Sequence, residues 1–280
     1  MRFGFVTCVE LGLSCMKAIY EIGGRLELAI TLPDDRARQK SGRVYLDAFC
    51  AEHAIPLVKS PNVNDAAVVA AIREAGIDWL FIIGWSQIAR EEVLAAPRRG
   101  VLGMHPTLLP VGRGRAAIPW AILKGLERTG VTLFKLDGGV DTGEILDQVV
   151  IPLSPTTDAT TLYAASEAAH MALMKNAYPL LLADALQPRV QDEAAATLWP
   201  GRKPEDGAID LAGSVVDAER LVRAVTRPYP GAFVSQGARK LILWRARIAA
   251  PDEECGDDPC LAFPDGRLRA LDWEEAPPDA

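Results

Sequence analysis

Histidine, cysteine and long apolar runs are all scarce in this chain of 280 residues. The five cysteines are an odd number spread thinly, which indicates a reducing cytoplasm rather than a disulfide scaffold. No uninterrupted apolar run approaches the roughly 20 residues that a membrane-spanning helix needs. The first apolar run ends at Glu10 with no cleavage-like site after it, which argues against a signal peptide. We therefore expect a cytoplasmic protein with no membrane partner.

An excess of positive charge is absent as well. The 30 lysines and arginines stand against 37 aspartates and glutamates, which gives a formal net charge of -7. A chain of this charge has no general affinity for nucleic acid or anionic membranes. Hydrophobic residues at 49% and charged residues at 24% are ordinary globular proportions and exclude a disordered or fibrous chain. The length suits one large domain and one small domain.

The first half of the chain alternates apolar runs with segments of helical spacing. Strands that are apolar throughout and separated by helices indicate a parallel sheet covered on both faces. The expected strands are Phe3–Cys8, Leu26–Leu32, Pro56–Val58, Asp78–Ile83, Gly100–His105 and Thr129–Leu136, and the expected helices are Leu13–Ile22, Arg43–His53, Asp65–Ala75 and Ile118–Leu126. Because sites in such sheets lie beyond the carboxyl ends of the strands, the loops Gly84–Ile88 and His105–Arg115 are the first candidates.

The second half has a different composition. A long alanine-rich helix is expected over Thr160–Ala185, and the later segment LWPGRKPEDG is typical of a linker or domain entry. Shorter elements indicate a small β-rich domain; they are the helix Ala218–Val225 and the apolar stretches Leu241–Ile248, Cys260–Phe263 and Leu268–Trp273. The expected organisation is a first domain over residues 1–188, a linker over 189–204 and a C-terminal domain over 205–280.

The chain has only three histidines, and one of them stands in a loop suited to chemistry. His105 follows an expected buried strand and begins the segment HPTLLPVGRGR, whose prolines and glycines prevent its continuation as helix or sheet. A histidine at such a place points into the crevice and can exchange a proton near neutral pH. The local pattern leaves a catalytic and a structural role equally open. For His53 and His170, in or beside expected helices, we expect surface or packing roles.

Asp141, Arg113 and Arg115 are the other polar candidates. Asp141 lies in the glycine-rich segment DGGVDTGEI, which is compatible with a backbone that approaches a ligand closely or with an acidic hairpin loop. Arg113 and Arg115 suit a phosphate or carboxylate group, and they suit loop anchoring through backbone carbonyls equally well. No metal is expected, because Cys255 and Cys260 have no second pair of ligands after them. A complete GxGxxG segment is also missing, so dinucleotide binding is not supported.

Two segments together resemble the signature of the folate-dependent formyltransferases. They are GVLGMHPTLLPVGRGRAAIPWAILKG and TGVTLFKLDGGVDTGEIL, and their HPTLLP and DTG motifs lie about 35 residues apart, each after an expected strand. PEDGAIDL and RLVRAVTRPYPGAF further resemble the start of the C-terminal domain in the methionyl-tRNA and sugar-nucleotide enzymes of this family. The resemblance covers most of residues 1–250. It implies a Rossmann-like parallel-sheet domain that binds N10-formyltetrahydrofolate and transfers the formyl group to a primary amine.

The resemblance also implies roles for individual residues. His105 matches the family's general acid/base, and Asp141 matches the aspartate that pairs with it. Arg115 matches a substrate-contacting arginine of the sugar-type enzymes, and we expect Arg113 of the same loop to bind substrate as well. The residues that match the segments holding the folate are Gln87, Ile88, Ala89, Asp137, Gly138, Gly139 and Val140.

Two positions depart from the family's pattern. The family has an asparagine two residues before the histidine, whose amide stabilises the oxyanion, whereas this chain has Gly103 there. Loss of such a donor typically lowers the rate about 10²–10³-fold. A backbone N–H, an ordered water, Ser86, Gln87 or protonated His105 could replace it; otherwise the reaction is slow or altered, or the protein binds folate without transfer. Phe134 stands where the family often has a histidine, and we draw no functional conclusion from it.

The acceptor amine is expected to belong to a small molecule. Residues 191–280 contain 17 acidic and 11 basic residues, a net charge of -6, whereas a domain that holds tRNA needs a basic surface. The arginine loop and RPYPGAF look closer to enzymes that act on nucleotide-linked amino sugars, which need one or two cationic contacts. Methionyl-tRNA formyltransferase, formyltetrahydrofolate hydrolase and a folate-binding protein without catalysis remain the alternatives. A homodimer is compatible with the sequence.

Overall fold

The chain folds into two compact units, and the computed structural model describes residues 1–35, 43–236, 239–253, 256 and 258–277. The first unit comprises Met1–Arg113, Gly130–Val150 and Glu167–Thr197, and the second comprises Gly114–Thr129, Ile151–Ser166 and Leu198–Ala280. Four elements continue from one unit into the other, namely β6 (Arg113–Gly114), β7 (Arg128–Lys135), β8 (Ile145–Pro152) and α6 (Ala159–Leu182). The domain boundaries expected from the sequence, at residues 188 and 205, stay a prediction.

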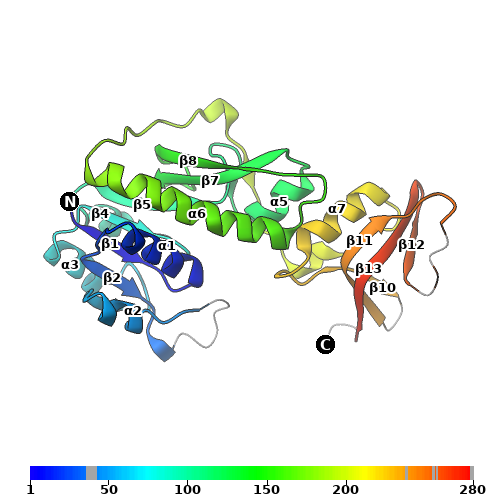
Figure 1. Cartoon of the computed structure of the whole chain (residues 1–280), viewed down its shortest axis with the longest axis horizontal. Coiled ribbons are helices and arrows are strands. Elements are labelled where there is room, and N and C mark those ends of the chain that lie inside the picture. Colours follow the sequence, from blue (N-terminus) through cyan, green and yellow to red (C-terminus); the bar gives the residue numbers. More distant parts are fainter. Residues whose placement is uncertain (36–42, 237–238, 254–255, 257, 278–280) are drawn as a thin grey trace. The chain divides into compact units, whose positions relative to one another are not determined.

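A seven-stranded and mainly parallel sheet forms the centre of the first unit (Figure 1). Its strand order is β3-β2-β1-β4-β5-β7-β8, and the pairs from β3 to β5 are parallel, as the apolar runs predict. The expected parallel-sheet fold is confirmed, and at one edge of the sheet β7 runs antiparallel to β5. The strands not yet given are β1 (Phe3–Val6), β2 (Leu28–Thr31), β3 (Leu57–Lys59), β4 (Trp79–Ile82) and β5 (Gly100–His105).

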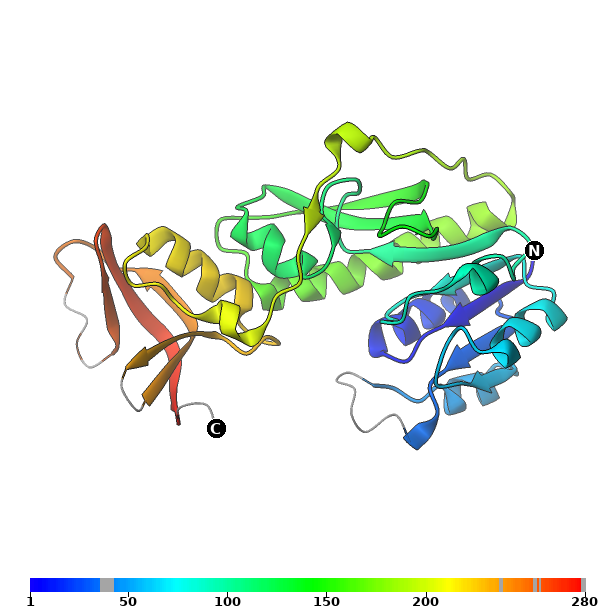
Figure 2. The same cartoon turned by 180° about the vertical axis from the view of Figure 1, so that it is seen from behind.

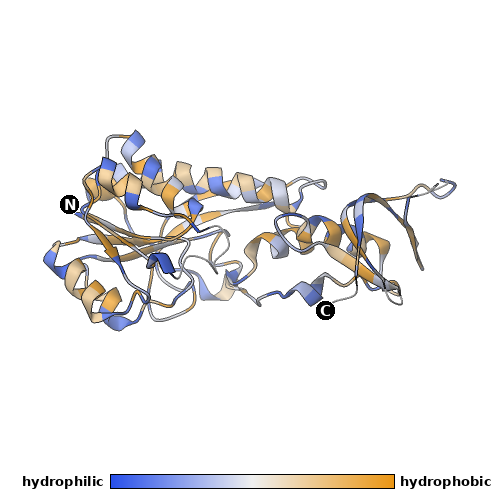
Figure 3. Ribbon diagram, turned by 90° about the horizontal axis from the view of Figure 1, so that it is seen from below, coloured by the Kyte–Doolittle hydropathy of each residue, from blue (hydrophilic) through white to orange (hydrophobic). Residues whose placement is uncertain are grey.

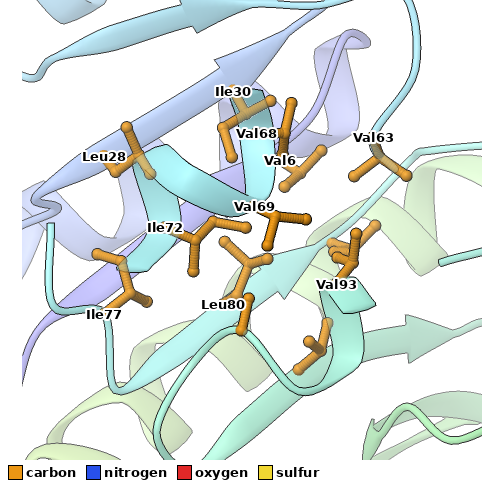
Figure 4. Close-up of a cluster of buried hydrophobic side chains, with 13 residues drawn as sticks. Val6, Leu28, Ile30, Val63, Val68, Val69, Ile72, Ile77, Leu80 and Val93 are labelled. Carbon is orange, nitrogen blue, oxygen red and sulfur yellow. The ribbon is translucent and has the colours of Figure 1, made fainter. Parts of the chain in front are cut away.

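Helices cover both faces of this sheet. The helices of the first unit, besides the end of α6, are α1 (Glu10–Glu21), α2 (Asp47–Glu52), α3 (Ala66–Glu74) and α4 (Glu91–Leu94). On one face, α6 places the ring of Tyr178 at 4.6 Å from that of Phe3 on β1. On the other, α3 packs Val68 and Ile72 into a buried apolar cluster with Val6 of β1 (Figures 2 and 4). The hydropathy colouring shows the same pattern, with apolar residues concentrated on the strands (Figure 3).

The second unit is a small antiparallel sheet with helices packed against it, which confirms the expected β-rich C-terminal region. Its four strands have the order β10-β11-β13-β12, and α7 packs against β11, β13 and α5. These elements are α5 (Ala117–Leu123), α7 (Val215–Val225), β10 (Ala232–Gln236), β11 (Arg239–Ile248), β12 (Cys260–Phe263) and β13 (Gly266–Ala276). Short strands β6 (Arg113–Gly114) and β9 (Leu198–Trp199) pair with one another, so part of the expected linker is a strand.

Within the described ranges, no helix combines the length and the apolar character needed to cross a bilayer. Cys8, Cys15 and Cys50 are free and buried. Burial raises the pKa of the Cys15 thiol to about 12 and that of Cys50 to about 11, so neither is a thiolate nucleophile at neutral pH. Cys260 is disulfide-bonded, unlike the reduced cysteines that the sequence suggested, and it is therefore no metal ligand. Cys255 lies outside the described residues.

Candidate active site

His105 is the last residue of β5, and its imidazole is held from one side by the loop that follows. The side chain is nearly buried, and Nε2 lies 2.8 Å from the carbonyl oxygen of Gly112. Because a carbonyl oxygen only accepts hydrogen bonds, Nε2 carries a proton and donates a hydrogen bond to the carbonyl oxygen of Gly112. Nδ1 is therefore the ring nitrogen left to exchange a proton with another group.

Asp141 lies opposite this second nitrogen. Its Oδ2 is 3.5 Å from Nδ1 of His105, and the two side chains are 19% and 11% exposed. Asp141 adopts a left-handed backbone conformation, with φ of 54°, a region that aspartate tolerates better than most residues. The structure thus brings together the two residues that the sequence singled out for acid/base chemistry.

Thr132 fixes the start of the loop that follows His105. It is the partner of His105 in the β5–β7 register. Its hydroxyl donates to the carbonyl oxygen of Thr107 at 2.7 Å and accepts from the N–H of Leu109 at 3.1 Å and from Nε2 of Gln148 at 2.8 Å. A single buried hydroxyl therefore ties three parts of the chain together beside the imidazole.

Thr107 provides an unsatisfied polar atom in the same loop. Its side chain is 1% exposed, and Oγ1 is buried without a hydrogen-bond partner in the described part of the chain. A buried hydroxyl in this state costs about 1–3 kcal/mol. Buried polar groups of this kind usually find a partner in a water molecule or a ligand. Two residues after the histidine, Thr107 is a polar group that a bound substrate could satisfy.

The guanidinium of Arg113 is buried and paired within the protein. It binds Oε1 of Gln191 through Nε and Nη2 at 3.0 and 2.9 Å, and both carboxylate oxygens of Glu193 through Nη1 and Nη2 at 2.9 and 2.6 Å. These bonds to Glu193 raise the pKa of Arg113 and lower the pKa of Glu193. The arrangement is loop anchoring, one of the two roles that the sequence left open, although the anchors are side chains rather than backbone carbonyls.

Gln191 and Thr197 complete a clamp, which we define as residues 191–197, across the two loops of the site. The amide of Gln191 donates to the carbonyl oxygens of Asp141 and Gly143 at 2.8 and 2.7 Å. Thr197 accepts from the N–H of Gly112 through Oγ1 at 2.8 Å, beside the carbonyl that holds His105. The clamp therefore positions both partners of the histidine. It falls in the stretch that the sequence suggested was a linker, and no sequence signal marks it.

Gly103 lies two residues before His105, and the space beside it is apolar. It pairs with Phe134 across β5 and β7. A Cβ built on Gly103 would lie 2.7 Å from Cδ2 of Leu136 and 3.4 Å from the ring of Phe134. The latter packs with Leu109 and Ile145, while Leu136 is partly buried against them. The two departures from the family's pattern, Gly103 and Phe134, are thus neighbours and form one apolar packing unit.

The two segments expected to hold the folate, residues 87–89 and 137–141, each expose one apolar side chain. Ile88 and Val140 are 83% and 57% exposed. Gln87 is engaged elsewhere: its oxygen accepts from the N–H of Val63 at 2.9 Å, and its amide donates to Pro61 at 2.8 Å. These bonds anchor the Gln87 side chain to the segment 61–63. Ala89, half-buried between Ile88 and Arg90, packs against the apolar cluster under the sheet.

The carboxylate of Asp137 shapes the second of these segments. It accepts from the N–H of Gly139 at 2.9 Å and from the hydroxyl of Thr142 at 2.7 Å. Gly139 lies so close to Thr142 that a side chain would not fit, whereas nothing lies within 4 Å of a Cβ placed on Gly138. The loop is thus tightly packed at Gly139 and open at Gly138. The exposed side chain of Val140 follows them, directly before Asp141.

The remaining candidates have surroundings of their own. Arg115 belongs to the second unit, and its side chain is exposed. Its backbone N–H donates to the carbonyl oxygen of Trp199 at 3.0 Å. His53 packs against the rings of Tyr20 and Phe49. His170 is buried in α6. Among the residues that the structure describes, no group of three or more histidine, cysteine or carboxylate side chains could hold a metal ion.

Both parts of the chain, the α/β unit and the small antiparallel sheet, match models of one family. The formyl transferase N-terminal domain matches residues 23–177, and the formyl transferase C-terminal domain matches residues 202–268. The chain belongs to this family, as the motifs predict, and the family uses formyl-tetrahydrofolate.

Solved structures of similar fold cover nearly the whole chain. A methionyl-tRNA formyltransferase from Clostridium thermocellum is 20% identical over 99% of this chain and 100% of its own, with a TM-score of 0.65. An N-formyltransferase from Helicobacter canadensis, in complex with folinic acid and dTDP-3-aminofucose, is 16% identical over 96% and 98%, with a TM-score of 0.72. HypX from Aquifex aeolicus, in complex with tetrahydrofolic acid, is 17% identical over 99% of this chain and 46% of its own, with a TM-score of 0.68.

Proposed function

We propose that this protein is a cytoplasmic N-formyltransferase that moves a formyl group from N10-formyltetrahydrofolate to the primary amine of a nucleotide-linked amino sugar. The observation that carries the proposal is the pairing of His105 with Asp141, with Nδ1 and Oδ2 at 3.5 Å. Both residues match the positions that perform acid/base chemistry in the family, and the clamp holds both in place.

The reaction needs one proton to change place. The amine nitrogen attacks the formyl carbon, a new C–N bond forms, and the bond between that carbon and N10 of the folate breaks. One proton leaves the amine and one arrives at N10, so a group that both accepts and donates is required. His105 does this through Nδ1, because Nε2 is committed to Gly112. Asp141 stabilises the imidazolium that exists between the two transfers.

The folate would be held by the backbone of Gln87–Ala89 and of Asp137–Asp141. The exposed side chains of Ile88 and Val140 fit this role, because an aromatic ring system gains from contact with apolar surface. When bound, formyltetrahydrofolate supplies the activated formyl group, and the protein supplies orientation and the proton path. Two arginines lie in the loop His105–Arg115. We propose that Arg115 contacts the acceptor and that Arg113 supports binding indirectly, because it anchors this loop.

The negative charge that gathers on the formyl oxygen must be stabilised without the family's asparagine. Gly103 carries no donor, and the space next to it is filled by Leu136 and Phe134. Protonated His105 is one donor that the site retains, and the unpaired hydroxyl of Thr107 is a second. A preorganised donor of this kind is worth about 2.7–4 kcal/mol of transition-state stabilisation.

The apolar surroundings of Gly103 favour one second candidate, a folate-binding protein that does not transfer the formyl group. That protein would bind the folate through the same two segments. It would show no turnover with any amine, and His105 would have no effect on a rate.

The experiment that separates these functions is release of tetrahydrofolate, followed by absorbance with and without a panel of amino-sugar nucleotides. We expect release that requires an amine and falls at least about 100-fold in His105→Ala and in Asp141→Asn. His53→Ala, which removes a histidine from an aromatic packing contact, is the matched control and should retain the rate. Release without an amine would indicate a hydrolase, and folate binding without release from any amine, methionyl-tRNA included, would contradict the proposal.

A further inference from the structure

Two cationic side chains of the second unit lie against the ring of one tryptophan, Trp120 of α5, and a third cation lies beside the segment that carries one of them. The guanidinium carbon of Arg202 lies 5.1 Å from the centre of its ring, and Nζ of Lys124 lies 5.5 Å from it. The side chain of Arg115 lies against Gly201, the residue before Arg202, at 3.6 Å from a Cβ placed there. We call Arg115, Trp120, Lys124 and Arg202 the Trp120 cluster.

In the described part of the chain, no ion pair with a carboxylate involves Arg115, Lys124 or Arg202. The nearby carboxylate of Asp206 accepts from the N–H of Lys203 at 2.7 Å, and only its backbone carbonyl receives a bond from Arg202, also at 2.7 Å. Burial lowers the pKa of Arg202, with a smaller opposing effect of Asp206.

Other arginines of the same unit are neutralised by carboxylates. Arg223 is paired with Glu219 at 2.7 Å, and Arg227 with Asp272 at 3.0 Å. Glu253 pairs with arginines from two strands. The Trp120 cluster differs from these pairs in that two cations share one aromatic ring and no carboxylate, so the cluster keeps its positive charge for a ligand.

The cluster is also held in a fixed shape before any ligand binds. Nε1 of Trp120 donates to the carbonyl oxygen of Pro200 at 2.8 Å, and the N–H of Arg115 donates to that of Trp199 at 3.0 Å. Lys124 reaches a second ring as well, at 5.9 Å from the centre of Trp199. The backbone that carries the cations, namely the segment 199–202 and the residues on either side of α5, is therefore tied together by hydrogen bonds, which lowers the entropy cost of binding an anion.

We propose that the Trp120 cluster is a binding site for a diphosphate group of a small molecule. Guanidinium groups match phosphate oxygens in a bidentate manner, and the ammonium of Lys124 adds a point charge. A diphosphate has enough oxygens to contact both cations of the Trp120 ring at once. That the diphosphate belongs to the acceptor rests on the proposed function, whereas the binding itself does not.

The test is calorimetric titration of the full chain with inorganic pyrophosphate, in the absence of folate and amine. We expect Arg202→Gln and Lys124→Gln to weaken binding at least about 10-fold each, and added salt to weaken binding by the wild type. Arg227→Gln is the matched control, because Arg227 also stacks on a tryptophan, Trp244 at 4.2 Å, but has a carboxylate partner. It should bind pyrophosphate as the wild type does.

Each other outcome overturns the proposal. The proposal is overturned if the wild type does not bind pyrophosphate. It is also overturned if Arg202→Gln and Lys124→Gln bind pyrophosphate as tightly as the wild type, or if Arg227→Gln loses as much affinity as they do. Binding of a short RNA with the same variant dependence, but not of pyrophosphate, would assign the cluster to a nucleic acid instead. Lys124 is exposed, so its variant carries the test if Arg202→Gln does not fold, and Arg202→Lys should restore part of the affinity. Pyrophosphate binding without formyl transfer would leave this site intact and remove only the proposed function.

Discussion

Gln191 shows how one buried amide can join two loops of the candidate site. It donates both of its N–H groups to carbonyl oxygens of the Asp141 loop and accepts two bonds from Arg113, whose loop also holds the carbonyl bonded to His105. A leucine of similar size would keep the volume but leave three groups around it unpaired. The position of the Asp141 carboxylate relative to the imidazole would then be set less sharply.

We predict that Gln191→Leu lowers kcat of formyl transfer about 10–100-fold, since small misplacements of catalytic groups have effects of this size. The KM for the folate should change much less, because the folate-binding segments keep their own anchors. Steady-state kinetics and a thermal unfolding curve would check both points. Gln187→Leu, the same substitution at an exposed position, is the control, and an unchanged kcat in Gln191→Leu would contradict a positioning role.

At the scale of elements, the contact between β5 and β7 determines what the site can contain. Gly103 and Phe134 face one another in the register, and Leu136 fills the space in which a side chain at position 103 would begin. We predict that Gly103→Asn does not increase the rate of formyl transfer and destabilises the protein by about 1–3 kcal/mol through overpacking.

Chemical denaturation would measure this change in the free energy of unfolding. Gly138→Asn is the matched control for stability alone, because a side chain there meets nothing within 4 Å and should cost little. A stable Gly103→Asn variant with a raised kcat would show that the apolar neighbours yield easily. Addition of Leu136→Ala to Gly103→Asn should recover part of the lost stability.

The elements that the sequence predicted best are those with the strongest local pattern. The apolar run Gly100–His105 is β5 with the same bounds, and the long alanine-rich helix is α6 to within a few residues. β8 and β10 were missed, because their residues are only partly apolar and their pairing partners are set by the tertiary fold. Arg43–His53 was predicted as one helix, but α2 begins only at Asp47.

The same limit applies to the site. His105 and Asp141 are visible in the sequence, because each follows a strand in a loop punctuated by glycine or proline. Thr132, Gln191 and Thr197 are not, since their importance comes from hydrogen bonds to residues 23–85 positions away. No local pattern encodes a contact at that separation. Arg113 was placed in the right loop, but the choice between anchoring and substrate contact required its partners.

At the scale of the whole molecule, charge argues against a polyanionic substrate. The net charge is -7, and the second unit pairs several of its arginines with carboxylates. We predict that binding of tRNA is weak and that log K falls with log salt with a slope smaller in magnitude than about 3. A surface that contacts 6–10 phosphates gives a much steeper dependence. Filter binding between 50 and 200 mM salt, roughly the range in which such surfaces lose affinity, would measure the slope. A loss of about 10³-fold or more would favour the methionyl-tRNA enzyme.

The clamp has a consequence for the time at which the protein becomes competent during its synthesis. Gln191 is made 50 residues after Asp141, the residue whose loop it holds. At about 5–20 residues per second, the ribosome needs roughly 3–10 s to bridge that interval. A nascent chain therefore carries its histidine and aspartate for several seconds as an unassembled pair. It becomes an enzyme only when the segment through Thr197 has left the exit tunnel and folded back over both loops.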